Sequence, residues 1–156
     1  MATIAMTREE REAFLTGVHV GVLSVGQGEP HGGERAPLAV PIWYDYEPGR
    51  EVRFVTGRAS RKGKRLAVGA PVSLCVQQEA PPYKYVSVEG VVVAVDAADV
   101  ERDVRPLARR YLGEQGGDQY VAATREMYAD EENVLVRVRI ERWFSVDYAK
   151  EWSTPS

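Results

Sequence analysis

The residues whose types and spacing could do chemistry lie in one short stretch, GRASRKGKRL, at residues 57–66. Ser60 is a good N-cap for a helix from about Arg61 to Val68. Cations then crowd the positive end of the helix dipole, which disfavours each by roughly 0.3–1 kcal/mol. A bound phosphate would relieve this, since backbone N–H groups, a hydroxyl and guanidinium groups can hold it. The stretch therefore predicts a phosphate site, with a solvated basic surface turn as the alternative. Its basic residues are Arg58, Arg61, Lys62, Lys64 and Arg65.

The rest of the chain offers no comparable set of reactive side chains. His19 and His31 have no cysteine or carboxylate at ligand spacing, so we expect no metal site. No Gly-x-Ser-x-Gly motif marks a serine nucleophile. Cys75 is the single cysteine, and its place in an apolar run predicts a small buried residue rather than a nucleophile.

Length and composition limit the classes of protein to consider. A chain of 156 residues predicts one domain, 1–156, with its core at about 7–150. Apolar residues make up 44% and charged residues 28%, which is typical of a globular protein. The net charge is −3, and the dense cluster of basic residues occupies a single turn, which argues against nucleic acid or an anionic membrane as partner. No signal peptide and no apolar run near the ~20 residues of a membrane span are evident, so we expect a cytoplasmic protein.

Strands flank the basic turn on both sides. Alternation of apolar residues predicts strands at 18–25, 37–46, 51–56, 72–76, 84–95 and 133–146. Pro41 indicates an edge or a bulge, and Gly90 a bend or a close backbone approach. Thr7 and Glu10 form a capping box for a helix that ends at Gly17. Two further helices are predicted at 96–112 and 119–128, joined by a loop at 113–118.

The motifs along these elements resemble one known superfamily. They are Thr56-Gly57, Ser60-Arg61-Lys62-Gly63, Leu66, Pro71, Ser73-Leu74 and the segment 86–90 (VSVEG). In this order they resemble the pyridoxamine 5'-phosphate oxidase-like superfamily, and more closely its flavin/deazaflavin oxidoreductase branch. The resemblance implies a mainly β fold, a six-stranded, mostly antiparallel split β-barrel with peripheral helices.

The resemblance also implies roles for individual residues. Val55 and Thr56 would line the cofactor, while Ser60, Arg61 and Lys62 would hold its phosphate. Arg65, with Arg58 and Lys64, would supply countercharge to an acidic cofactor tail. Independently of the resemblance, Trp43 lies near the bulge expected at Pro41 and could form a wall against a planar ligand, with packing in a core or a subunit interface as the alternative. A rough alignment places Tyr85 where the flavin mononucleotide oxidases have a glutamine, and Pro37 where they have a phosphate-binding arginine.

The implied activity is hydride transfer between a bound cofactor and a small organic substrate. Because Pro37 stands where those oxidases have the arginine, a guanidinium is missing from the phosphate site. This favours the deazaflavin coenzyme F420 over flavin mononucleotide (FMN), since the phosphate of F420 is a singly charged diester. The proton donor could be solvent, Tyr44 or Tyr85. Two alternatives stay open: an FMN-dependent pyridoxamine 5'-phosphate oxidase, and a non-catalytic cofactor carrier. The apolar residues Trp43, Trp143 and Phe144, together with the resemblance, predict a homodimer.

Overall fold

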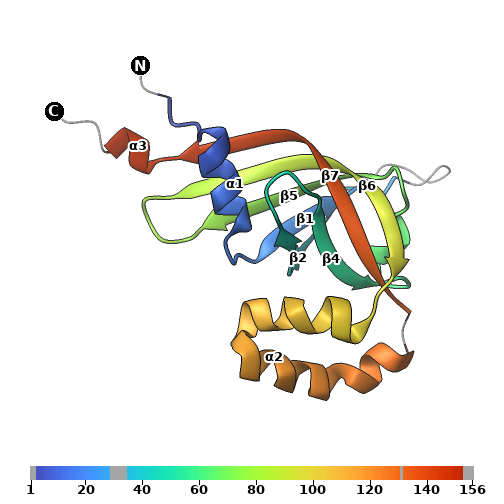
Figure 1. Ribbon diagram of the computed structural model, residues 1–156. Helices are drawn as coiled ribbons and strands as arrows, with labels where there is room; N and C mark the ends of the chain where they lie inside the picture. The colour runs from blue at the N-terminus through green and yellow to red at the C-terminus, as the bar shows by residue number, and fades with distance from the viewer. Residues whose placement is uncertain (1–2, 29–34, 131, 153–156) are drawn as a thin grey trace.

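The core of the fold is one antiparallel sheet of seven strands. The computed structural model describes residues 3–28, 35–130 and 132–152. Hydrogen bonds connect the strands in the order β2-β1-β5-β6-β7-β4-β3. The long strands β6 and β7 pair along most of their length and run across the whole sheet (Figure 1). The bounds are β1 Gly21–Val25, β2 Leu38–Ile42, β3 Asp45–Tyr46, β4 Val52–Gly57, β5 Pro71–Gln78, β6 Lys84–Ala97 and β7 Asn133–Asp147.

The strand predicted at 37–46 is divided in two, which corrects the strand number from six to seven. β2 pairs with β1 at one edge of the sheet, and β3 pairs with β4 at the other. Only Trp43 and Tyr44 separate them. Because the three Cα–Cα steps from Ile42 to Asp45 reach at most about 11 Å, the sheet must curl until the ends of its two edge strands lie close together. The result is a split barrel joined at its seam by the chain, and Pro41 lies on an edge strand, as expected.

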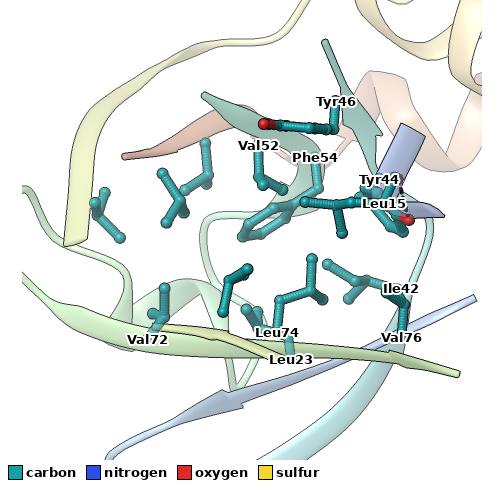
Figure 2. Packing of buried hydrophobic residues seen from close by; sticks show 14 of the residues in the cluster. Leu15, Leu23, Ile42, Tyr44, Tyr46, Val52, Phe54, Val72, Leu74 and Val76 are labelled. Carbon is teal, nitrogen blue, oxygen red and sulfur yellow. Dashed lines mark hydrogen bonds between the residues drawn. The ribbon is translucent and has the colours of Figure 1, made fainter. Parts of the chain in front are cut away.

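Alternating side chains of the curled sheet fill its interior. Val52 and Phe54 of β4 point towards Leu23 and Leu74 on the opposite wall (Figure 2). The same alternation turns Cys75 outward, so the prediction of a buried cysteine was wrong. Gly90 is the close approach that was predicted, since a Cβ there would lie 2.5 Å from the carbonyl oxygen of Arg139.

Helix α1, Arg8–Thr16, closes one side of the barrel. The predicted capping box is present: the Glu10 amide donates to the Thr7 hydroxyl, and the Thr7 amide donates to the Glu10 carboxylate. Leu15 is fully buried in the core. The short helix α3, Ala149–Trp152, follows β7 at the same side of the molecule, near both termini (Figure 1).

A helical hairpin lies against the other side of the barrel (Figure 1). Asp99 caps a π-helical turn, Val100–Val104, which continues into α2, Arg105–Asp130. The predicted loop at 113–118 is instead helical apart from Gly113, whose φ of 79° reverses the chain. Gly117 packs so closely on Arg109 that a Cβ would lie 2.6 Å from its Cα. The glycines here serve close helix packing rather than a flexible loop.

Acid should loosen this hairpin through Asp118. Hydrogen bonds from Arg109 and then Arg105, on the first arm, lower the pKa of Asp118 on the second arm to about 2. A carboxylate whose pKa falls on folding contributes stability above its unfolded value and loses it as pH drops towards the folded value. We therefore expect the protection factors of the α2 amides, which compare each exchange rate with the intrinsic rate at the same pH, to fall between about pH 4 and pH 2. Asp118→Asn should show low protection factors throughout this window, and a wild type whose protection factors do not fall by pH 2 would contradict the prediction.

Candidate cofactor site

The basic turn between β4 and β5 is built around the Ser60 hydroxyl. Its Oγ donates to the carbonyl oxygen of Gly57 at 2.6 Å and accepts from the amide of Gly63 at 3.0 Å. The predicted cap contact is therefore present, but the helix expected to Val68 is only a 3-10 turn, Gly63–Arg65. Repulsion among the cations and the low helix propensity of Gly63 explain why it goes no further. Because Ser60 is engaged inside the turn, it positions the loop rather than presenting a free donor.

Three cations of this turn lack a carboxylate partner. Arg61, Lys62 and Lys64 form no ion pair within the residues that the structure describes. Arg58, in contrast, pairs with Glu132, with Nε and Oε2 3.2 Å apart. Unpaired cations on a rigid turn attract an anion without first breaking an internal salt bridge. The arrangement fits the phosphate site that the sequence predicted.

The turn stands at one end of an aromatic cleft between the outer face of the sheet and α2. The Lys62 side chain lines this cleft, which has a volume of about 350 Å³. Trp43 stacks on Tyr111, with ring centroids 5.1 Å apart and planes 8° apart, and packs tilted against Tyr120. A space of this size with aromatic side chains and one cation in its lining suits a planar ring that carries an anionic group. The other lining residues are Val20, Pro41, Ile42, Val55, Val104, Leu107 and Tyr128.

The predicted site residues divide into those at this cleft and those away from it. Trp43, Val55 and Lys62 line it together. Thr56 points inward instead, only 5% exposed, with its Oγ1 3.2 Å from the Ser60 Oγ. Tyr85 of β6 lies opposite Val146 of β7, whereas Val55, at the cleft, lies opposite Leu135 near the other end of β7. A single chain therefore does not bring Tyr85 to the cleft. Arg61 is exposed on the turn and Arg65 is half-buried beside it.

Of the two tyrosines predicted as proton donors, neither reaches the cleft. Tyr44 is fully buried, and its hydroxyl donates to the carbonyl oxygen of Leu15 at 2.6 Å. Burial raises the pKa of Tyr44 far above its usual range. Tyr120 and Tyr128, whose hydroxyls lie 2.9 Å apart, line the cleft instead. The sequence predicted a helix over both residues, but only the fold of the hairpin shows that they face the cleft.

Other kinds of site find no support in the described part of the chain. No three His, Cys, Asp or Glu side chains there are grouped to hold a metal ion, and His31 lies outside it. Among the same residues, no helix has the length and apolar character needed to cross a bilayer.

Comparison with known proteins identifies the family. The model of the pyridoxamine 5'-phosphate oxidase family matches residues 7–147, so the chain belongs to that family. No curated protein matches it. Three similar solved structures show the same fold. A conserved hypothetical protein, Rv2991, from Mycobacterium tuberculosis has 23% identity and a TM-score of 0.72, covering 100% of this chain and 94% of its own.

The other two solved structures have lower scores. An F420 reductase has 19% identity and a TM-score of 0.63, covering 85% of this chain and 94% of its own. A FAD-binding protein from Mesorhizobium loti has 18% identity and a TM-score of 0.58, covering 90% of this chain and 92% of its own. The split barrel expected from the sequence is thereby confirmed.

Proposed function

We propose that this protein is an oxidoreductase that holds a flavin or deazaflavin in the aromatic cleft and transfers a hydride between it and a small organic substrate. The observation that carries the proposal is that Lys62, which forms no ion pair with any described residue, lines the same cleft as Trp43. Family membership and the similarity to an F420 reductase and a FAD-binding protein support it. When bound, the cofactor supplies the hydride chemistry, and the protein supplies orientation and charge.

Each wall of the cleft has a task in this proposal. Trp43 and Val55 would contact the ring, because they offer apolar surface on the sheet side. Lys62 and Arg61 would bind the phosphate, and the amides of Arg61 and Lys62, which have no partner within the described residues, could add hydrogen bonds. The helical hairpin would cover the ring and limit access of water, which strengthens charge interactions inside the cleft.

Within this class, we propose coenzyme F420 rather than FMN. An arginine that grips the dianionic phosphate of FMN in the oxidases is replaced by Pro37, which lies exposed before β2. A singly charged phosphodiester needs less countercharge, and Arg58, Lys64 and Arg65 stand near to serve an acidic tail.

Competitive titration of the apo-protein with both cofactors under identical salt tests the choice. Tighter binding of coenzyme F420 is expected, and tighter binding of FMN would overturn it. Single-turnover reoxidation by quinones, enones or tetrapyrroles then tests the enzyme activity. A loaded protein that none of these reoxidises would be a carrier, and hydrogen peroxide released with pyridoxamine 5'-phosphate would indicate an oxidase.

The proton that accompanies the hydride is expected to come from Tyr120. Its O–H bond breaks, the proton goes to the substrate, and the Tyr128 hydroxyl donates to the phenolate until water reprotonates it. Tyr120→Phe should slow single-turnover reduction by roughly 100-fold or more and change its solvent isotope effect, with cofactor affinity unchanged. Tyr83→Phe, at an exposed tyrosine outside the cleft, is the control. Unchanged rates in both Tyr120→Phe and Tyr128→Phe would assign the proton to solvent.

We also propose that the protein is a homodimer, formed through the outer face of the sheet. Residues that lie directly opposite each other on neighbouring strands point to the same face of the sheet. On the outer face, one such row of uncharged side chains crosses five strands. The row consists of Pro41, Val22, Cys75, Ser87 and Phe144. Val22 is 41% and Phe144 50% exposed, large fractions for apolar side chains. Tyr85 faces the same side, two residues before Ser87 on β6, and a dimer could bring it to the site of the partner.

A carboxylate in this row should separate the subunits. Burying an unpaired charge costs several kcal/mol, so Val22→Glu should raise the dimer dissociation constant by more than a hundredfold. Val68→Glu, at a valine that is 67% exposed outside the row, should leave the dimer intact. Light scattering at micromolar concentration reads the result. A wild type that is monomeric with the cofactor bound would contradict the dimer.

A further inference from the structure

A second cleft adjoins the aromatic cleft and differs from it in charge. The two clefts share Val55 and Leu107 in their linings, so they lie next to each other at these side chains. The second cleft, here called the arginine cleft, has a volume of about 370 Å³. Its other lining residues are Asp45, Arg53, Phe54, Arg102, Asp103, Pro106, Arg110 and Leu135.

The arginine cleft carries an excess of one positive charge, because three arginines face two aspartates. Each arginine is held in place by an internal contact. Arg53 pairs with Asp45, and the Arg110 Nη2 donates to the carbonyl oxygens of Thr16 at 2.6 Å and Gly17 at 2.9 Å.

The third arginine is held by a nearly buried carboxylate. Arg102 Nη2 lies 2.8 Å from Oδ2 of Asp103, whose side chain is only 8% exposed. Burial opposes ionisation of Asp103, but hydrogen bonds from Arg102 and the Asp99 amide outweigh it, so the pKa of Asp103 lies below its usual value. Asp103 therefore stays charged and keeps Arg102 in place.

Two arginines face each other beside the cleft. Arg53 lies directly opposite Arg137 across β4 and β7, with both side chains on the outer face. Like charges opposite each other repel, and here Asp45 pairs with Arg53 and Asp96 with Arg137. The Nη2 group of Arg53 donates a hydrogen bond to Asp45. The Nε and Nη1 groups of Arg53 form no hydrogen bond with the residues that the structure describes. These donors remain for a ligand, and paired N–H groups of a guanidinium match the two oxygens of a carboxylate.

We propose that the arginine cleft binds the carboxylate of the hydride acceptor, and that the acceptor is a small conjugated acid whose unsaturated end reaches the aromatic cleft. The inference rests on the proposed function, because it is the ring in the aromatic cleft that the acceptor must meet. Two sources could bring a carboxylate here, the acceptor or the acidic tail of a deazaflavin. The shared wall at Val55 and Leu107 favours the acceptor, because it adjoins the space proposed for the ring.

The test needs no turnover and begins with the apo-protein. Calorimetric titration compares cinnamate with cinnamamide, a pair that differs in the charged group alone. The wild type is expected to prefer the acid by at least tenfold. Arg53→Gln and Arg102→Gln should each reduce that preference by roughly tenfold or more. Arg139→Gln removes the same charge from an exposed arginine outside both clefts and should change nothing.

A second titration, with saturating cofactor, distinguishes the two sources of carboxylate. Cinnamate that binds with undiminished affinity beside the cofactor supports the acceptor assignment. Competition between cinnamate and coenzyme F420, without competition from FMN, would overturn it and assign the cleft to the cofactor tail. Equal affinity for acid and amide in the apo-protein, or a preference that survives both arginine variants, would overturn the site itself. Failure of cofactor binding, in contrast, would contradict the proposed function and leave the apo-protein preference intact.

Discussion

Replacing Lys62 with alanine is expected to weaken cofactor binding by roughly tenfold to more than a hundredfold. Hydrogen bonds to charged groups contribute about 1.5–3 kcal/mol each, and 1.4 kcal/mol corresponds to tenfold in affinity. Lys62 is the basic residue of the turn that lines the aromatic cleft, and its removal breaks no ion pair within the residues that the structure describes. Arg61→Ala should act in the same direction. Titration of each variant with FMN and with coenzyme F420 gives the dissociation constants.

Lys64→Ala provides the matched control for Lys62→Ala. It removes the same charge from the same turn, but Lys64 is exposed and does not line the cleft. Exposed charges contribute about 0.2–1 kcal/mol, so FMN affinity should fall by no more than about fivefold. Circular dichroism should show unchanged folding in all three variants. Wild-type affinity in both Arg61→Ala and Lys62→Ala would make the basic turn a solvated surface feature.

Replacing Gly63 with alanine should abolish cofactor binding through the shape of the turn rather than its charge. A Cβ at position 63 would lie 2.0 Å from the carbonyl oxygen of Gly57 and 2.9 Å from the Ser60 Oγ. Neither atom can withdraw without opening the turn, because the same two atoms form the 2.6 Å hydrogen bond that closes it. Forcing an extra carbon into a packed site costs about 1–3 kcal/mol. We therefore expect a lower free energy of unfolding by about that amount and displacement of Arg61 and Lys62 from the phosphate.

Gly26→Ala separates this effect from the general cost of changing a glycine. A Cβ at Gly26 would meet no atom within 4 Å, so both stability and binding should stay close to wild type. Urea unfolding and cofactor titration of the two variants make the comparison. If Gly63→Ala unfolds and binds like Gly26→Ala, then the turn is more adaptable than its hydrogen bonds indicate.

The strands and the capped first helix could be predicted from the sequence because their signals are local. Alternation in Val52, Phe54 and Thr56 gives the inward face of β4 directly, and the Thr7–Glu10 capping box depends on four residues. The division between β2 and β3 could not be predicted in this way. Pairing at opposite edges of the sheet depends on residues distant in sequence, and Trp43 and Tyr44 continue the alternation of a strand.

The functional site could be predicted only in part, because some of its signals are local and others depend on how distant segments pack. Composition alone marks the basic turn, the resemblance adds Val55, and the position of Trp43 near Pro41 suggested a wall for a ligand. The structure brings Val55 and Trp43 together with Lys62. The helical walls of both clefts escaped prediction, because periodicity gives the apolar stripe of a helix but not the surface against which it packs. The glycines at 113, 116 and 117 indicated a loop, whereas Gly113 forms the turn of α2 and Gly117 allows its two arms to pack closely.

The seam at Trp43 and Tyr44 couples the cleft to the barrel interior. Neighbouring side chains point to opposite faces, so Trp43 stacks against the helical hairpin while Tyr44 is buried in the core and bonds to Leu15 at the end of α1. Tyr111 reinforces the junction, since its hydroxyl accepts from the Tyr44 amide at 3.0 Å. A ligand that fixes Trp43 therefore also fixes the two edges of the sheet. Binding therefore raises the free energy of unfolding, by about 2.7 kcal/mol when the free ligand concentration is a hundred times the dissociation constant. Thermal shift of the whole barrel is thus a reporter of cleft occupancy that requires no knowledge of the substrate.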